Sequence, residues 1–200
     1  MDIDVEDSES LRILTEQNRV VFLRWSGIYE WNWDNQNFKR LTTIEDGTDA
    51  EANVLSRDGK TFLFATRTHF LKGDTSTGLL VDKTSFPSVQ FSQQIRFSPY
   101  GRYALFDQPS KGTAYEVVET LTGKRLWGFK GLLTDTWTIS DDEQTIFVGQ
   151  GKQWEVRDLK TGTLLRRLQC VPDTSSAASS PDGGVLYFAS HGVLYRQRAR

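Results

Sequence analysis

The stretch "VRDLKTGTLL" (residues 156–165) places a polar turn, Asp-Leu-Lys-Thr-Gly, between two runs that suit β-strands. Related turns occur earlier in the chain as "DNQN" from Asp34, "DTSTG" from Asp74 and "ETLTG" from Glu119. Counted up to Asp158, consecutive copies are 40, 45 and 39 residues apart. A period of about 40 residues is typical of repeat architectures, so this turn predicts a fold built from one repeated unit.

A second turn signal runs in step with the first. Its copies are "LTEQNR" from Leu14, "LSRDGK" from Leu55, "FSPYGR" from Phe97, "ISDDEQ" from Ile139 and "SSPDGG" from Ser179. Each copy precedes a short run rich in apolar, β-branched and aromatic residues, which is too short for a helix and typical of a buried strand. The two signals together indicate five units, near residues 11–45, 46–86, 87–130, 131–170 and 171–200.

The turn residues have physical roles. Proline presets φ, glycine accepts a left-handed backbone, and an Asp carboxylate accepts N–H groups across the turn. The strand that follows the buried one alternates polar and apolar residues, as at Trp154 and Glu155, which predicts one wetter face. Each unit is therefore expected to hold four antiparallel strands, with structural turn residues at Asp34, Asp74, Glu119, Asp158 and Gly162.

Sheets that are apolar on both faces must stack on neighbours of the same kind, and a ring of radial sheets, a β-propeller, achieves this. The stretches "VRDLKTGTLLRRL" (156–168) and "FSPYGRYALF" (97–106) resemble the strand turns of the WD-repeat superfamily. The resemblance covers about residues 11–198, although the usual Gly-His pair is absent and the Trp-Asp pair survives only as Trp33-Asp34. It implies an all-β, WD-like propeller of about five blades in a single domain, residues 1–200.

The fifth unit ends after its third strand, in "GVLYRQRAR" (192–200). In WD-like propellers the N-terminus often supplies the outer strand of the last blade, and "DIDVE" (2–6) alternates as a strand does. Opposite charges would then face each other across an antiparallel pair: Asp2, Asp4 and Glu6 against Arg196, Arg198 and Arg200. We expect residues 1–7 to close the ring of a monomer. The alternatives are an acidic tail, a fragment of a larger ring, or a short helix over residues 8–17.

The overall composition narrows the class of protein. The chain has 200 residues, 38% hydrophobic and 25% charged, which is enough for a buried core. Its net charge of −2 argues against a broad nucleic-acid surface. The single cysteine, Cys170, forms no intrachain disulfide, and no apolar run is long enough to span a membrane. We therefore expect a cytoplasmic protein without nucleic-acid or membrane partners.

Asp158 could be a catalytic residue rather than a turn residue. An Asp followed closely by Lys-Thr-Gly also occurs in the phosphorylated loop of ion-pumping ATPases, and an Asp near Thr-Gly occurs in aspartic proteases. The pump loop has Lys directly after the Asp, whereas Leu159 follows Asp158. Asp74 and Glu119 occupy the position of Asp158 in the second and third units, and a catalytic nucleophile would not recur in each repeat. The turn interpretation is therefore favoured. The tryptophans at strand positions, Trp31, Trp33, Trp127, Trp137 and Trp154, are expected to pack in the core or between blades.

The loops after the second strands would gather on one face of a propeller. They carry basic and aromatic residues and both histidines: Arg24, Trp25, Arg67, His69, Lys111, Lys152 and His191. Trp and Arg are favoured anchors at interfaces, and loops on a rigid scaffold often carry function. We predict a non-enzymatic module that binds a protein or peptide on this face; the alternative is ordinary solvated loop chemistry. The histidines lack ligand-spaced partners, so no metal is expected.

A second hypothesis is a small-ligand or carbohydrate site at the central mouth of the ring. Glu51 and Asp135 begin innermost strands of two units, and a pair of carboxylates suits binding or hydrolysis of glycosides. The sequence contains no Gly-rich phosphate loop, nucleophile elbow or zinc pattern. We accordingly predict no catalytic residues and no cofactor.

Overall fold

The computed structural model describes residues 10–14, 18–24, 27–43, 52–66, 68–85, 95–108, 114–130, 137–150, 153–169 and 174–199. All nineteen regular elements in these ranges are β-strands, and none is a helix. This confirms the predicted all-β class. The strand at residues 10–14 shows that a helix is not adopted in that part of the first unit. The predicted closing strand, residues 1–7, lies outside the described residues.

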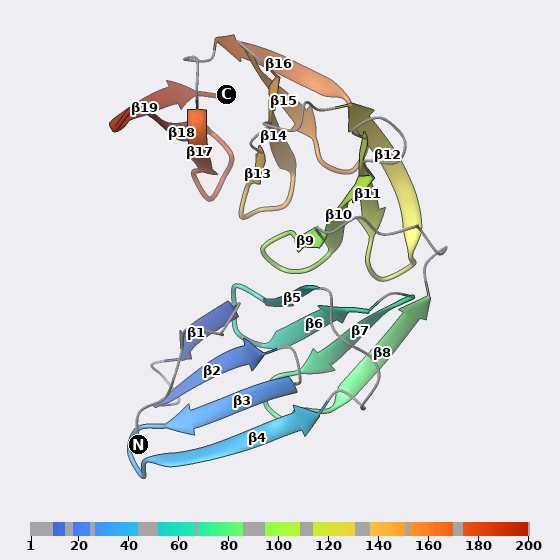
Figure 1. Cartoon of the computed structure of the whole chain (residues 1–200), viewed down its shortest axis with the longest axis vertical. Coiled ribbons are helices and arrows are strands. Elements are labelled where there is room, and N and C mark those ends of the chain that lie inside the picture. The colour runs from blue at the N-terminus through green and yellow to red at the C-terminus, as the bar shows by residue number, and fades with distance from the viewer. Residues whose placement is uncertain are drawn as a thin grey trace. The chain divides into compact units, whose positions relative to one another are not determined.

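The strands form five sheets, each from consecutive strands (Figure 1). The first contains β1 (Ser10–Leu14), β2 (Arg19–Arg24), β3 (Gly27–Asn32) and β4 (Asn37–Thr43). The second contains β5 (Ala52–Leu55), β6 (Thr61–Ala65), β7 (His69–Asp74) and β8 (Leu80–Ser85). The third contains β9 (Ile95–Phe97), β10 (Tyr103–Gln108), β11 (Ala114–Glu119) and β12 (Lys124–Lys130).

The fourth sheet contains β13 (Trp137–Ile139), β14 (Thr145–Gln150), β15 (Gln153–Asp158) and β16 (Leu164–Gln169). The fifth has three strands in the described part of the chain: β17 (Thr174–Ser179), β18 (Val185–Ser190) and β19 (Val193–Arg198). Neighbouring strands of the first, second, fourth and fifth sheets pair antiparallel, as two-hairpin units require. The short final sheet agrees with the early end of the fifth unit in the sequence.

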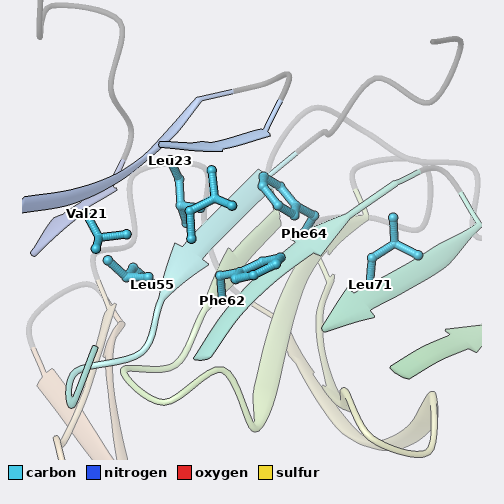
Figure 2. Packing of buried hydrophobic residues seen from close by; sticks show 7 residues of the cluster. Val21, Leu23, Leu55, Phe62, Phe64 and Leu71 are labelled. Atoms are coloured by element: carbon cyan, nitrogen blue, oxygen red, sulfur yellow. The ribbon is translucent and has the colours of Figure 1, made fainter. Parts of the chain in front are cut away.

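The chain divides into two compact units, residues 1–104 with 119–124, and residues 105–118 with 125–200. In the first unit, side chains of the first and second sheets form one core, and Figure 2 shows β2 residues grouped with those of β5 and β6. The buried residues of this core are Val21, Leu23, Ile28, Leu55, Phe62, Phe64 and Leu71. Burying such side chains contributes about 1.5–3 kcal/mol each, so stacking of sheets is the main stabilising contact.

In the second unit, the fourth and fifth sheets stack in the same way. Their shared core is Phe147, Trp154, Val156, Leu168, Leu186, Phe188 and Ala199. Trp154 is fully buried, and Trp127 is half-buried with its Nε1 donating to the Leu159 carbonyl at 2.8 Å. Trp31, Trp33 and Trp137 are half-buried. Trp154 and Trp127 thus pack within the second unit, against Phe188 and Phe129 respectively.

The predicted wetter face of the third strands is wrong at three glutamates. Glu30, Glu116 and Glu155 are all buried, although they lie on strands whose alternation predicts a solvent-facing side. Each carboxylate is paired with cations: Glu30 with Arg19 at 2.5 Å, Glu116 with Arg125 at 3.0 Å, and Glu155 with Arg157 at 2.5 Å. A buried carboxylate requires such a partner, and sequence alternation alone does not reveal it.

Candidate functional site

The turn between the first two strands of a unit is held by a repeated Ser-x-Asp arrangement. In the second sheet, Ser56 Oγ donates to Asp58 Oδ1 at 2.7 Å and accepts the Thr61 N–H at 2.9 Å. Asp58 Oδ1 also accepts the Lys60 N–H at 3.1 Å. Equivalent bonds occur at Ser140 with Asp142 and at Ser180 with Asp182. The carboxylate therefore caps this turn in three of the units.

These bonds also set the charge state of Asp58. Burial raises the pKa of this carboxyl, but the hydrogen bonds from Ser56 Oγ and the Lys60 N–H, with the Lys60 charge, outweigh burial and lower it below its usual value. The ionised form is therefore the one that the folded turn favours.

The third unit departs from this arrangement. Ser98 Oγ accepts the Tyr103 N–H at 3.0 Å, as its counterparts in the second, fourth and fifth units do, but Tyr100 stands where those three units have the capping Asp. The Tyr100 ring is half-buried and lies beneath the Arg102 guanidinium, 5.8 Å from the ring centroid. The turn has exchanged a carboxylate cap for an aromatic side chain.

The turns between the third and fourth strands show a second departure in the same unit. Asp158 Oδ1 accepts the Thr161 N–H at 2.7 Å, and Asp74 Oδ1 accepts the Ser76 N–H at 2.8 Å and the Thr77 N–H at 3.0 Å. Hydrogen bonds from the Ser76 hydroxyl and the Thr77 N–H lower the pKa of Asp74. The third unit has Glu119, whose Oε2 accepts the Thr122 hydroxyl at 2.6 Å.

The turn after β3 corrects one predicted residue. The acceptor that caps this turn is Asn32, whose Oδ1 accepts the N–H groups of Asp34 at 3.0 Å and Asn35 at 3.3 Å. Asp34 instead accepts the side-chain amide of Asn18 at 2.7 Å. Asn32 ends β3 as Asp74 ends β7, so Asn32 is the counterpart of Asp74 in the first unit. The sequence pattern had placed this counterpart two residues later, at Asp34.

Tyr100 and Glu119 both line a cleft of about 250 Å³, all of whose lining residues belong to the first unit. One wall comes from the second sheet and consists of Leu63, Phe70, Lys72, Asp82 and Thr84. The other wall comes from two turns of the third sheet, residues 100–103 and 119–121. The two departures from the repeat therefore meet in one place, which makes this cleft the candidate site.

Hydrogen bonds to backbone carbonyls hold the two walls. Thr84 Oγ1, on β8, donates to the Leu121 carbonyl at 2.9 Å. Thr120 donates its N–H to the Arg102 carbonyl at 2.9 Å and its hydroxyl to the Gly101 carbonyl at 2.5 Å. The Phe70 ring also packs edge-on against Phe97 of β9, with centroids 6.0 Å apart. The cleft is consequently formed by fixed elements rather than by free loops.

The lining combines an apolar base with charges of both signs. Leu63 and Phe70 are buried, whereas the Leu121 side chain is 65% exposed. Lys72 and Arg102 are exposed, and Asp82 and Glu119 are half-buried. Lys72 and Asp82 are register partners on β7 and β8, but no ion pair joins them in the described part of the chain. The cleft can thus accept an apolar group with polar or charged neighbours.

Most of the predicted loop face lies outside the described residues. These predicted residues lie outside the described ranges: Trp25, Arg67, Lys111, Lys152, and the mouth carboxylates Glu51 and Asp135. Arg24 ends β2. His69 begins β7 with its Nδ1 2.7 Å from Thr68 Oγ1, and exposed His191 has its Nδ1 3.0 Å from Ser190 Oγ. The two histidines belong to different units, and the predicted face stays a prediction.

No group of three or more His, Cys, Asp or Glu side chains in the described residues could hold a metal ion. No helix in the same residues is long and apolar enough to cross a membrane. The sequence analysis missed Tyr100 as a site residue and treated Glu119 only as a turn residue. The signal was present in "FSPYGR" and "ETLTG", where both differ from their sister copies.

No protein-family model and no curated protein matches the chain. Solved structures do match it. One is the β-propeller domain of Cps50 (Swd1) from Myceliophteria thermophila, with a TM-score of 0.59 and 11% identity over 92% of this chain and 63% of that one. Another is KlHsv2 with loop 6CD replaced by a Gly-Ser linker, with a TM-score of 0.63 and 14% identity over 96% of this chain and 64% of that one.

Both neighbours are WD40-type β-propellers, so the comparison confirms the predicted fold, a divergent β-propeller. The chain spans about 63–64% of the length of these two structures. At sequence identities of 11% and 14%, the likeness concerns the fold alone.

Proposed function

We propose that this protein is a non-enzymatic interaction module that binds a peptide segment of a protein partner in the cleft of the first unit. The observation that carries the proposal is the double departure of the third unit. Both substituted turn residues, Tyr100 and Glu119, line the same cleft. Sites where a repeat breaks its own local rule are where function is expected to override stability.

The dimensions and chemistry of the cleft favour a peptide over a compact small ligand. Its volume of about 250 Å³ is below the roughly 300–1,000 Å³ of typical small-molecule pockets, and suits one or two inserted side chains. The apolar base and the charges of both signs match the mixed chemistry of a polypeptide. Walls fixed by Thr84 and Thr120 reduce the ordering cost of binding.

The likeness to WD40-type propellers supports an interaction role in general. The loop face around Arg24 and Trp25 remains a separate predicted surface, and the cytoplasmic location and monomeric state remain predictions.

The substitution Tyr100→Asp separates binding from folding, because it restores the Asp-capped turn of the second, fourth and fifth units. Short random peptides displayed on phage are selected on the wild-type protein, and their affinities are measured by fluorescence anisotropy. We expect Tyr100→Asp to weaken the selected peptides by about tenfold or more while keeping or raising the melting temperature. The matched control, Asp142→Tyr, makes the reverse change in the fourth unit and should lower stability without affecting these peptides.

Selected peptides that bind the Tyr100→Asp variant as tightly as the wild-type protein would contradict the cleft as the binding site. The same conclusion follows if Asp142→Tyr, at unchanged folded fraction, weakens them equally.

A further inference from the structure

We infer that the cleft selects peptides in which an apolar side chain stands next to an acidic residue, and that Lys72 is the specificity-determining residue. This inference rests on the proposed function and adds the chemistry of the peptide. Two observations support it: the sign and exposure of the charged side chains in the cleft, and the reversed order of charges at Lys72 and Asp82 relative to three other sheets.

Lys72 inverts the charge order of three other sheets. In three sheets a buried glutamate on the third strand pairs with a cation on the fourth: Glu30 with Lys39 at 3.4 Å, Glu116 with Arg125 at 3.0 Å, and Glu155 with Arg167 at 3.5 Å. In the second sheet the third strand carries the cation, Lys72, and the fourth carries Asp82. The described residues form no ion pair between them, and Lys72 is exposed. Its charge is therefore available to a ligand.

The outermost charges of the cleft are positive. Lys72 and Arg102 are exposed, whereas Asp82 and Glu119 are half-buried and Glu119 already accepts the Thr122 hydroxyl. Arg102 lies over the Tyr100 ring. Lys72 carries its ammonium on a flexible four-carbon stem, which reaches an incoming carboxylate more readily than the shorter Asp82 reaches a cation. An acidic residue at the mouth is thus favoured over a basic one.

The apolar part of the recognition comes from the base and rim of the cleft. Phe70 and Leu63 form a buried base, and the exposed Leu121 side chain stands at the rim. The Leu121 carbonyl is fixed by Thr84, so this leucine is presented on a held backbone. The Leu121 side chain and the apolar base together offer one side chain of a peptide an apolar contact. The apolar anchor and the acidic neighbour must therefore be adjacent in the peptide.

The test repeats the peptide selection on variants of Lys72. Peptides selected on the wild-type protein should be enriched in Asp or Glu next to a large apolar residue. Selection on Lys72→Glu should replace this enrichment by Lys or Arg. Lys72→Met, which keeps the apolar stem, should remove the acidic preference without creating a basic one. The matched control is Lys83→Glu, an equal charge change at an exposed residue of β8 that does not line the cleft, and it should leave the preference unchanged.

Affinity supplies the second readout. An Asp→Asn change in a selected peptide should weaken binding to the wild-type protein by about tenfold and have little effect on Lys72→Met. Peptides that depend on Tyr100 but show no acidic enrichment would overturn this inference and leave the proposed function standing. Peptides that do not depend on Tyr100, or the absence of any bound peptide, would overturn both.

Discussion

Replacing Gly162 with alanine tests the physical account of the turn in "VRDLKTGTLL". Gly162 has φ +74°, and a Cβ added there would lie 2.5 Å from Cδ2 of Trp127 on β12. Carbon atoms pack at about 3.5–4.0 Å, so the indole must move. Trp127 Nε1 donates to the Leu159 carbonyl at 2.8 Å, and this bond fixes the ring against the turn.

The expected destabilisation has three parts. A left-handed backbone costs an alanine roughly 1–2 kcal/mol. Loss of the Trp127 hydrogen bond costs about 0.5–1.5 kcal/mol. Displacing the indole also disturbs its contact with Phe129, whose centroid is 5.4 Å away, at about 0.5–1.5 kcal/mol. Gly162→Ala should therefore lower the free energy of unfolding by about 2–5 kcal/mol, with Trp127 responsible for more than half of the upper figure.

The matched control is Gly192→Ala. Gly192 has φ +77°, but its added Cβ meets no atom within 4 Å, so only the backbone cost of about 1–2 kcal/mol applies. Both variants are unfolded in urea and followed by far-UV circular dichroism. In a Trp127→Ala background, Gly162→Ala should cost no more than Gly192→Ala. Equal costs of the two glycine substitutions in the wild-type background would refute the assigned role of Trp127.

Four further changes test other parts of the structure. Glu155→Gln should cost about 1–3 kcal/mol in urea unfolding because Arg157 loses a charged acceptor, whereas Arg167→Ala should cost under about 1 kcal/mol because Arg167 is 61% exposed. Asp58→Asn should lower the free energy of unfolding at pH 7. The pKa of Asp58 in the folded protein lies below 3.8, so the ionised carboxylate contributes stability above pH 3.8. This contribution is lost as the pH falls through the folded pKa, where the stabilities of variant and wild-type protein should converge. Deleting residues 1–7 should lower the melting temperature and promote self-association, and a monomer with unchanged melting would contradict ring closure.

Much of the fold could be predicted because a repeat supplies its own internal comparison. The periods of the two turns located the strands, since turn chemistry at residues such as Asp74 and Asp158 depends on neighbours two or three positions away. The pattern placed the capping residue of the first unit at Asp34, but Asn32, two residues earlier, accepts the corresponding N–H groups. The prediction of a wetter face on the third strands was wrong, because Glu30 and Glu155 are buried and paired with cations of their own sheets, which strand alternation does not reveal.

The candidate site was harder to predict, because it joins residues from three separate stretches. Lys72 and Asp82, Tyr100 and Arg102, and Glu119 and Leu121 converge only when the second sheet meets two turns of the third. The sequence shows that Tyr100 and Glu119 differ from their counterparts in other repeats, but it does not show that both line one cleft. The sequence by itself determined the repeated four-stranded unit, because strands and turns follow from local periodicity and backbone preference. Only the tertiary structure decided which carboxylates are buried and paired and which deviations share a cleft, because both depend on how the strands and turns pack together.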